Sequence, residues 1–517
     1  MRLRTPTKAA ATAVAAVLSS AALLNASLAT AAGTAPGTSF TADPRATWQT
    51  DGIVWALAPA NGVVYVAGTF GSVRPPGAAP GERSVPRRNF AAFDAVTGAL
   101  LPCAPSFTGG AGTVRALHAS RDGKILYVGG SFSRAGAVRV ANAAALNTAD
   151  CTVRKAFRPS VTATVRAIDA TDRAVYLGGD FTRAGGRARK RIAAFAPDGS
   201  LLPFRADLDA PVRALSAVPS RAKVYAGGDF ESVNGHRAHA LVALSSTTGA
   251  TAHSYPGWLP PRSVVKSIAH DGTRFYVGAE GHGRGVFDGR VAGRLEDDTM
   301  AWKDTCLGAT QAVLPYEGVL YSASHAHDCG RTPGGFPEQR GGDRQHLLAQ
   351  SPGNRTILHW FPDTDEGAGE QIGPRALTVA RGVLWVGGEF TKVNGKPQQG
   401  LTRFAGGPDT GAPKAPALLP SAAGRGKVVL RWRAAWDRDD ASLTYRLYRD
   451  GRLVSRQKAA STPWNRPRMS YTDVVRAGTR HVYTIEVTDG TNTSPRSAPV
   501  TVAVPAKAVR QKGGART

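Results

Sequence analysis

Two histidines, an aspartate and a cysteine stand close together in the stretch LYSASHAHDC, residues 320–329. His325 and His327 are two residues apart, so on a β-strand their side chains lie on the same side. Imidazole nitrogens and carboxylate oxygens are common ligands of zinc and similar metals. This pattern predicts a metal site whose candidate ligands are His282, His325, His327 and Asp328.

A polar binding pocket braced by a disulfide is favoured over a metal site, because alternate strand positions also bring two histidines together by chance. A further metal ligand would have to come from Asp343 or His346, and the spacing fixes neither. No cofactor other than this divalent metal follows from the sequence. The candidate binding residues are Trp55, Gln311, His325, His327, Asp328 and Trp360.

An acidic cluster follows Trp360 and contains Asp363, Asp365, Glu366 and Glu370. It begins like a calcium loop but lacks the further ligand spacing. Two carboxylates on opposite sides of a cleft can also act as acid and base on a glycosyl bond. The candidate catalytic residues are Asp343, Asp363, Asp365 and Glu366. Serine-hydrolase, zinc-protease and sialidase motifs are absent.

These residues belong to a repeat. Its marker is a tyrosine or tryptophan followed in most units by two glycines, as in LYVGGSF and VYAGGDF. The marker residues are Tyr65, Tyr127, Tyr176, Tyr225, Tyr276, Tyr321 and Trp385, which are 62, 49, 49, 51, 45 and 64 residues apart. Each unit reads as three apolar strands and an aromatic fourth, as in AFRPSV and PFRADL. Four short strands at this period predict an all-β, seven-bladed β-propeller.

The unit PSFTGGAGTVRALHASRDGKILYVGGSFSRAG resembles the delta-60 type of bacterial propeller repeat. The resemblance covers residues 38–406 and implies a fold but no activity, because propellers host many functions. The last unit lacks an aromatic fourth strand. We expect the N-terminal segment to supply it, with Phe40 in the place of Phe157 or Phe204, so that the ring closes and no edge is exposed.

Two repeat positions predict cross-strand ion pairs. The first-strand position is Trp55, Arg115, Arg166, Arg213, Lys266, Gln311 and Arg375 in successive units. The second-strand position is Thr69, Ser131, Asp180, Asp229, Glu280, His325 and Glu389. Cation and carboxylate appear together in four units, which favours structural pairs. Arg115 opposite Ser131 is the exception, and in the sixth unit Gln311 should face His325.

The same register places Cys306 opposite Cys329, which predicts a disulfide, and Cys103 with Cys151 is then the remaining pair. Long insertions in the first, sixth and seventh units fall on one face of the predicted ring. Insertions collected on one face usually mark the working face, so the first, sixth and seventh units should border it.

The N-terminal 32 residues combine Arg2, Arg4 and Lys8 with an apolar run, which is typical of a secretory signal peptide. No later segment approaches the roughly 20 apolar residues of a membrane span. We therefore expect a secreted, extracellular protein, released and monomeric.

Residues 413–505 resemble a fibronectin type III domain. Trp432 fits its core tryptophan, LYRDG its next strand and turn, and Tyr483 its tyrosine corner. A linker at 407–412 precedes it and a basic tail at 506–517 follows. Residues 413–517 hold 20 Lys and Arg against 7 Asp and Glu, a charge that attracts polyanions.

The sequence therefore predicts a secreted binding protein for an extracellular polysaccharide or a cell-wall polyanion. A surface protein is an alternative partner, and nucleic acid is disfavoured because the chain is exported and lacks a nucleic-acid motif. The alternative functions are an exported polysaccharide-degrading enzyme and a purely structural protein.

Overall fold

The structure is a computed structural model that describes residues 37–281, 283, 285–338, 344–424 and 426–506. Antiparallel strands dominate these residues, whose only helix is the 3-10 turn η1 (Pro219–Arg221). Among the same residues, no helix has the length and apolar character needed to cross a membrane. The predicted signal peptide, His282, Asp343 and residues 507–517 of the basic tail lie outside the described residues.

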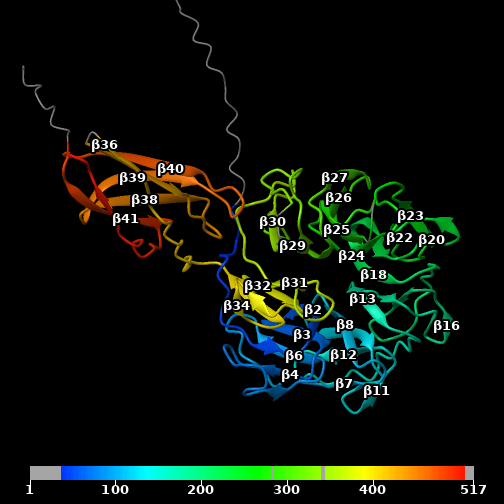
Figure 1. Cartoon of the computed structure of the whole chain (residues 1–517). Coiled ribbons are helices and arrows are strands. Elements are labelled where there is room, and N and C mark those ends of the chain that lie inside the picture. The colour runs from blue at the N-terminus through cyan, green and yellow to red at the C-terminus, as the bar shows by residue number, and fades with distance from the viewer. Residues whose placement is uncertain (1–36, 282, 284, 339–343, 425, 507–517) are drawn as a thin grey trace, which may run out of the picture. The chain divides into compact units, whose positions relative to one another are not determined.

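Sheets of three or four antiparallel strands follow one another along the chain (Figure 1). The first sheets are β2 (Ile53–Ala60), β3 (Val63–Thr69) and β6 (Phe90–Asp94); β8 (Thr113–Ala119), β9 (Ile125–Ser131) and β12 (Ala143–Asn147); β13 (Val165–Ala170), β14 (Val175–Gly179) and β17 (Ile192–Phe195); and β18 (Val212–Val218), β19 (Lys223–Gly228), β22 (Leu241–Ser245) and β23 (Thr251–Ser254). The later ones are β24 (Ser263–His270), β25 (Arg274–Gly281), β26 (Arg290–Arg294) and β27 (Met300–Asp304); β28 (Thr310–Tyr316), β29 (Val319–Ala326) and β30 (Gln345–Gln350); and β31 (Pro374–Ala380), β32 (Val383–Gly388) and β35 (Leu401–Ala405).

The first strands of these sheets contact one another in chain order, and β31 contacts β2. The sheets therefore surround a common axis, which is the arrangement of a β-propeller. The paired glycines of the repeat make this packing possible: a Cβ on Gly227 would stand 2.2 Å from Cγ1 of Val265 in the next sheet. The repeat thus keeps glycine where the neighbouring sheet approaches most closely.

Short ribbons extend the sheets at their loops. They are β1 (Gln49–Thr50), β4 (Ser72–Arg74) and β5 (Val85–Pro86); β7 (Phe107–Thr108), β10 (Arg134–Ala135) and β11 (Val138–Arg139); β15 (Arg183–Ala184) and β16 (Arg187–Ala188); β20 (Ser232–Val233) and β21 (His236–Arg237); and β33 (Lys392–Val393) and β34 (Lys396–Pro397).

The predicted aromatic fourth strands are wrong at AFRPSV and PFRADL. Residues 156–161 and 203–208 form no strand, only the isolated bridges Val161↔Ala184 and Leu208↔Val233. Phe157 and Phe204 are buried in the clusters between adjacent sheets, so burial of these rings, rather than a ladder, sets the path of the backbone.

The N-terminal segment runs along the edge of β35. The N–H groups of Thr41 and Arg45 donate to the carbonyls of Ala405 and Arg403, at 3.1 and 2.8 Å. Phe40 does not occupy the equivalent of the Phe204 site. It packs on Tyr321, 5.2 Å between ring centroids, in the cluster between the β28 and β31 sheets. Phe40 comes before Thr41 and Arg45 in the chain, and its ring lies between the β28–β29–β30 and β31–β32–β35 sheets.

The C-terminal residues form two packed sheets, and this unit is termed the C-terminal domain. One sheet contains β36 (Leu419–Gly424), β37 (Lys427–Arg433) and β40 (Arg468–Val474). The other contains β39 (Arg452–Ala460), β38 (Ser442–Arg449), β41 (Arg480–Thr488) and β42 (Val500–Ala503). Trp432 and Tyr483 are buried between the sheets. The Tyr483 hydroxyl donates to Asp473 at 2.8 Å.

Both predicted disulfides are confirmed: Cys103 pairs with Cys151 and Cys306 with Cys329. The bridge Leu307↔Asp328 lies directly beside the second bond, as the predicted register required.

Candidate functional site

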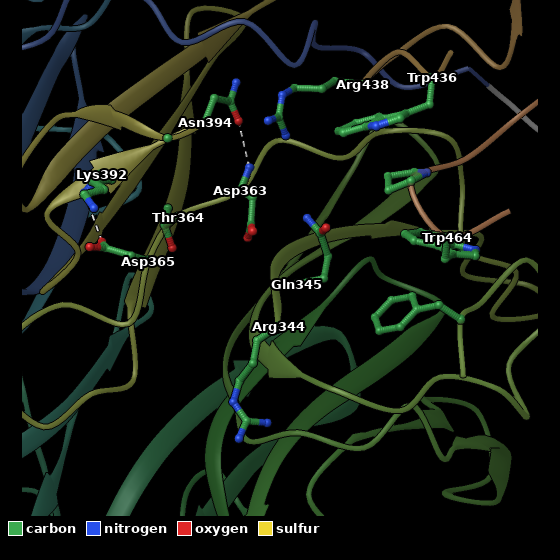
Figure 2. A pocket seen from close by; sticks show the side chains of 13 residues that line it. Arg344, Gln345, Asp363, Thr364, Asp365, Lys392, Asn394, Trp436, Arg438 and Trp464 are labelled. Carbon is green, nitrogen blue, oxygen red and sulfur yellow. Dashed lines mark hydrogen bonds between the residues drawn. The ribbon is translucent and has the colours of Figure 1, made fainter. Parts of the chain in front are cut away.

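A cleft of about 420 Å³ lies between loops of the last two propeller sheets and the C-terminal domain. Figure 2 shows Trp436 and Trp464 on one side, Lys392 and Asp365 on the other, and Asp363 between them. The cleft is lined by Phe336, Arg344, Gln345, Asp363, Thr364, Asp365, Lys392, Asn394, Gly395, Trp436, Arg438, Pro463 and Trp464. It thus combines aromatic rings with charged and amide groups, as ligand sites commonly do.

The aromatic side of the cleft is anchored to the propeller. Trp464 packs on Phe336 and Phe361, each at 4.7 Å between ring centroids. The Phe361 N–H donates to the Arg438 carbonyl, and the Arg438 guanidinium donates back to the Phe361 carbonyl, both at 2.8 Å. Cys306 and Cys329 belong to the same apolar cluster, so the disulfide braces the surface on which Trp464 rests.

Asp365 is held by the loop that it caps. Its carboxylate accepts hydrogen bonds from the Thr391 and Lys392 N–H groups and from the Thr391 hydroxyl, at 2.5 to 2.9 Å. Asp51 and Asp209 cap the corresponding loops of their units in the same way. Asp365 is therefore a repeated turn residue.

His325, His346 and Glu366 meet beside the cleft. The His325 Nε2 lies 2.7 Å from Oε1 of Glu366, which also accepts a hydrogen bond from Arg344 at 3.0 Å. The His346 ring stands against His325, with 5.6 Å between centroids. Its Nδ1 donates to Asp363 at 3.1 Å. Residues from β29, β30 and the acidic loop thus form one polar cluster.

Burial and neighbouring charges shift the titration of this cluster. Burial, assisted by the positive charge of Arg344, lowers the pKa of His325 below its usual value. Burial alone would raise the pKa of Glu366, but hydrogen bonds from His325 and Arg344 hold this pKa below the usual range. A neutral His325 beside an ionised Glu366 is therefore the favoured state at neutral pH.

A second hollow of about 390 Å³ lies at the propeller axis and is termed the axial cavity. It is lined by Trp55, Arg115, Arg166, Arg213, Lys266, Gln311, Glu370 and Arg375. All except Glu370 occupy the repeated first-strand position. A β-bulge at this position, as between Val212 and Ala214, turns the side chain toward the axis.

The predicted cross-strand ion pairs are confirmed. They are Arg166 with Asp180 at 2.6 Å, Arg213 with Asp229 at 2.5 Å, Lys266 with Glu280 at 3.1 Å, and Arg375 with Glu389 at 2.6 Å. Most cations of the axial cavity are therefore neutralised within their own sheets.

Arg115 is the predicted exception. Among the described residues it forms no ion pair, and its guanidinium stacks on Trp55 at 3.7 Å from the ring centroid. Arg375 contacts the same ring at 4.3 Å. Burial and the positive charge of Arg166 lower the pKa of Arg115 to about 10, so it stays charged at neutral pH. The Trp55 indole N–H donates to Thr69 at 3.0 Å, across the predicted strand pair.

Gln311 and His325 do not bind each other. The Gln311 amide donates to Glu280 of the preceding sheet at 2.6 Å, while His325 contacts Glu366 in the following loop. The bulge between Thr310 and Ala312 is shared with the sheets that keep their ion pair, and it turns Gln311 toward the axis, where its amide reaches Glu280. The predicted face-to-face pair is therefore wrong, and both side chains bind outside their own sheet.

The strand LYSASH has serines in a buried polar network and lacks the paired glycines of the other units. Arg290 is fully buried and donates to the hydroxyls of Ser322 and Ser324, at 3.0 and 2.9 Å. It also pairs with the buried Asp304 at 3.1 Å. Ser324 replaces the second glycine of the repeat, so the change supplies an acceptor for a buried arginine.

Other predicted residues lie apart from the polar cluster. His327 lies beyond the end of β29 and faces Glu338, 4.0 Å away. Asp328 accepts the Gly330 N–H at 2.9 Å and caps a turn. Trp360 is only 1% exposed and packs in the core against Tyr321, so it does not line the cleft.

Sequence reasoning missed the aromatic side of the cleft. Trp436 and Trp464 follow strands of the C-terminal domain, and both are half-buried rather than core residues. The sequence offered one clue to them: both tryptophans lie in loops, outside the alternating pattern of the strands. Their meeting with Asp363 depends on domain packing, which no spacing encodes.

No protein-family model matches the chain, and no curated protein matches it. A chain in the crystal structure of the mitotic checkpoint complex is 12% identical, with a TM-score of 0.47, over 72% of this chain and 98% of that chain. The Saccharomyces cerevisiae Sqt1 structure is 12% identical, with a TM-score of 0.41, over 70% and 98%. These values carry no argument about function, and the propeller fold rests on the sheets described above.

Proposed function

We propose that this protein is a secreted binding protein that holds an extracellular or cell-envelope polysaccharide in the cleft. The observation that carries the proposal is the lining of the cleft: aromatic rings from the C-terminal domain face charged and amide side chains of the propeller. A sugar ring offers an apolar face for stacking and hydroxyls for hydrogen bonds. The cleft presents partners for both.

The proposal includes a finer description of the fold. The successive sheets, with β31 against β2, support a seven-bladed propeller of the delta-60 repeat type. The strand orders β36–β37–β40 and β39–β38–β41–β42, with Tyr483 buried, support a fibronectin type III domain. The N-terminal residue pattern supports export by a signal peptide.

Charge favours an acidic polymer over a neutral one. Arg344, Lys392 and Arg438 line the cleft, and the Lys392 side chain forms no hydrogen bond or ion pair within the described part of the chain. Residues 413–517 add their excess of Lys and Arg. An anionic wall polymer would be attracted over longer range by the same field.

The alternative of a polysaccharide-degrading enzyme needs two carboxylates free to act. Asp365 is committed to turn capping, and Glu366 to His325 and Arg344. Asp363 holds His346 through one oxygen. The carboxylates of the acidic loop thus position other residues, which favours binding over hydrolysis.

Binding can be tested by titrating the full secreted chain with immobilised neutral and acidic polysaccharides at two salt concentrations. We expect retention of an acidic polymer, weakened about tenfold or more by Trp436→Ala, since a stacking ring is lost. Lys392→Gln should weaken binding and its salt dependence. Lys396→Gln is the matched control, because Lys396 lies on the same ribbon but does not line the cleft.

Equal binding by wild type and the Trp436→Ala variant would contradict the cleft as the site. If the chain retained a purified surface protein and no polysaccharide, the ligand would be a protein instead of a polysaccharide. Release of new reducing ends from a bound polymer would favour the enzyme alternative.

A further inference from the structure

The His325, His346 and Glu366 side chains offer three metal-ligand atoms in one place. One atom from each residue, two imidazole nitrogens and a carboxylate oxygen, lies within 4.8 Å of the others. They come from β29, β30 and the acidic loop, so three separate segments hold them in position. Two imidazoles and one carboxylate form a donor set suited to zinc and neighbouring divalent metals.

His346 provides an independent observation. Its Nε2 is buried and has no hydrogen-bond partner among the residues that the structure describes, and the residue is only 3% exposed. A buried polar nitrogen without a partner costs free energy, so such atoms usually have an unseen partner. A metal ion bound by this nitrogen, His325 and Glu366 would remove that cost.

Asp363 fixes the form of His346 that a metal requires. A carboxylate accepts, so the His346 Nδ1 must carry the proton that it donates to Asp363. In the neutral ring, Nε2 is then the nitrogen with the free lone pair. The His346 N–H donates to the same carboxylate oxygen at 2.9 Å, which fixes the backbone as well. A carboxylate behind a ligating histidine is the usual outer partner in metal sites.

We infer that His325, His346 and Glu366 bind a divalent transition metal of the zinc class, with Asp363 as a positioning residue. Three protein ligands leave a coordination position for water or for an oxygen of a bound molecule. Arg344 and Asp363 contact this site and also line the cleft, so the ion adjoins the proposed binding surface. The inference does not depend on the proposed function.

Arg344 opposes the ion electrostatically. Its guanidinium contacts Glu366 and lies near His325, so its positive charge should weaken metal affinity. His325 also donates to Glu366 before binding, so its neutral ring must move this proton to the other nitrogen before Nε2 can bind the ion. Both features predict a site of moderate affinity.

The test is zinc titration of the folded full chain against a chromophoric chelator, with elemental analysis after dialysis and cobalt absorption as a second readout. We expect one ion per chain. Glu366→Gln and His325→Ala should each weaken binding about 100-fold or more, and Asp363→Asn about 10- to 100-fold. His327→Ala is the matched control and should leave affinity unchanged. Arg344→Gln should strengthen binding about tenfold.

Three outcomes would overturn the inference: no zinc bound, stoichiometric zinc retained by the Glu366→Gln variant, or equal loss in the His327→Ala control. His346→Ala removes a buried side chain and can unfold the sheet locally. Glu366, which is partly exposed, therefore decides the matter if the His346 variant does not fold. If a variant that binds no metal still binds polysaccharide, the metal site and the proposed binding function are independent of each other.

Discussion

The β18–β19–β22–β23 and β28–β29–β30 sheets occupy equivalent places in the repeat but satisfy their polar groups differently. In the former, Arg213 and Asp229 bind each other within one sheet. In the latter, Gln311 binds the preceding sheet and His325 the following loop. In the β28–β29–β30 sheet, which lacks the internal ion pair, both side chains bind partners outside the sheet. Its polar side chains thereby become available to build a site.

The largest expected effect comes from the buried Arg290 network, which joins β26 and β27 to the serines of β29 in the irregular sheet. Arg290→Met should lower the free energy of unfolding by about 3–5 kcal/mol, because it leaves Asp304 buried without its charge partner. Chemical denaturation measures this. Arg294→Met on the same strand is the control, since Arg294 is exposed and should change stability by less than about 0.5 kcal/mol. Equal effects would contradict the assigned role of the network.

A smaller effect is expected in the C-terminal domain, where a buried carboxyl makes stability depend on pH. Next to the loop after β30, burial and the adjacent Asp437 and Asp43 carboxylates raise the pKa of Asp439 to about 7. In the unfolded chain this carboxyl titrates near its ordinary value. The folded state therefore binds more protons between pH 4 and 7, and stability should fall as pH rises through this range.

Asp439→Asn should flatten that pH dependence and raise the melting temperature at pH 8 by about 2–4 °C. Thermal unfolding at pH 5 and pH 8 measures both changes. The Ala42 N–H, which donates to Asp439 at 2.7 Å, keeps an acceptor in the variant. A pH dependence unchanged by this substitution would contradict the assignment.

The smallest expected effect on stability comes from making the β28–β29–β30 sheet regular. The double variant Gln311→Arg, His325→Asp restores the pair present at Arg213 and Asp229. It should change the free energy of unfolding by less than about 1 kcal/mol, because a new partly exposed ion pair offsets the lost hydrogen bonds. Denaturation and zinc titration together test this: zinc binding should disappear while stability remains. A loss of several kcal/mol would show that the sheet needs its irregular residues to fold.

The sequence by itself determined the features that depend on local periodicity. The recurring YxGG strands predicted the propeller, and the first glycine of the pair admits the neighbouring sheet, as at Gly227. Charge covariation between two repeat positions predicted ion pairs such as Lys266 with Glu280, because cross-strand neighbours have a fixed register. The same register predicted the Cys306–Cys329 disulfide, and Cys103 with Cys151 followed as the remaining pair.

Only the tertiary structure decided which residues from different units meet. His346 joins His325 because β30 returns beside β29, whereas His327, closer in sequence, lies past the strand end. Trp464 reaches the cleft because it docks on Phe336. Strand alternation fixes which way a side chain points relative to its neighbours in sequence. The contacts between sheets and domains are set by packing of the whole chain, which spacing does not record.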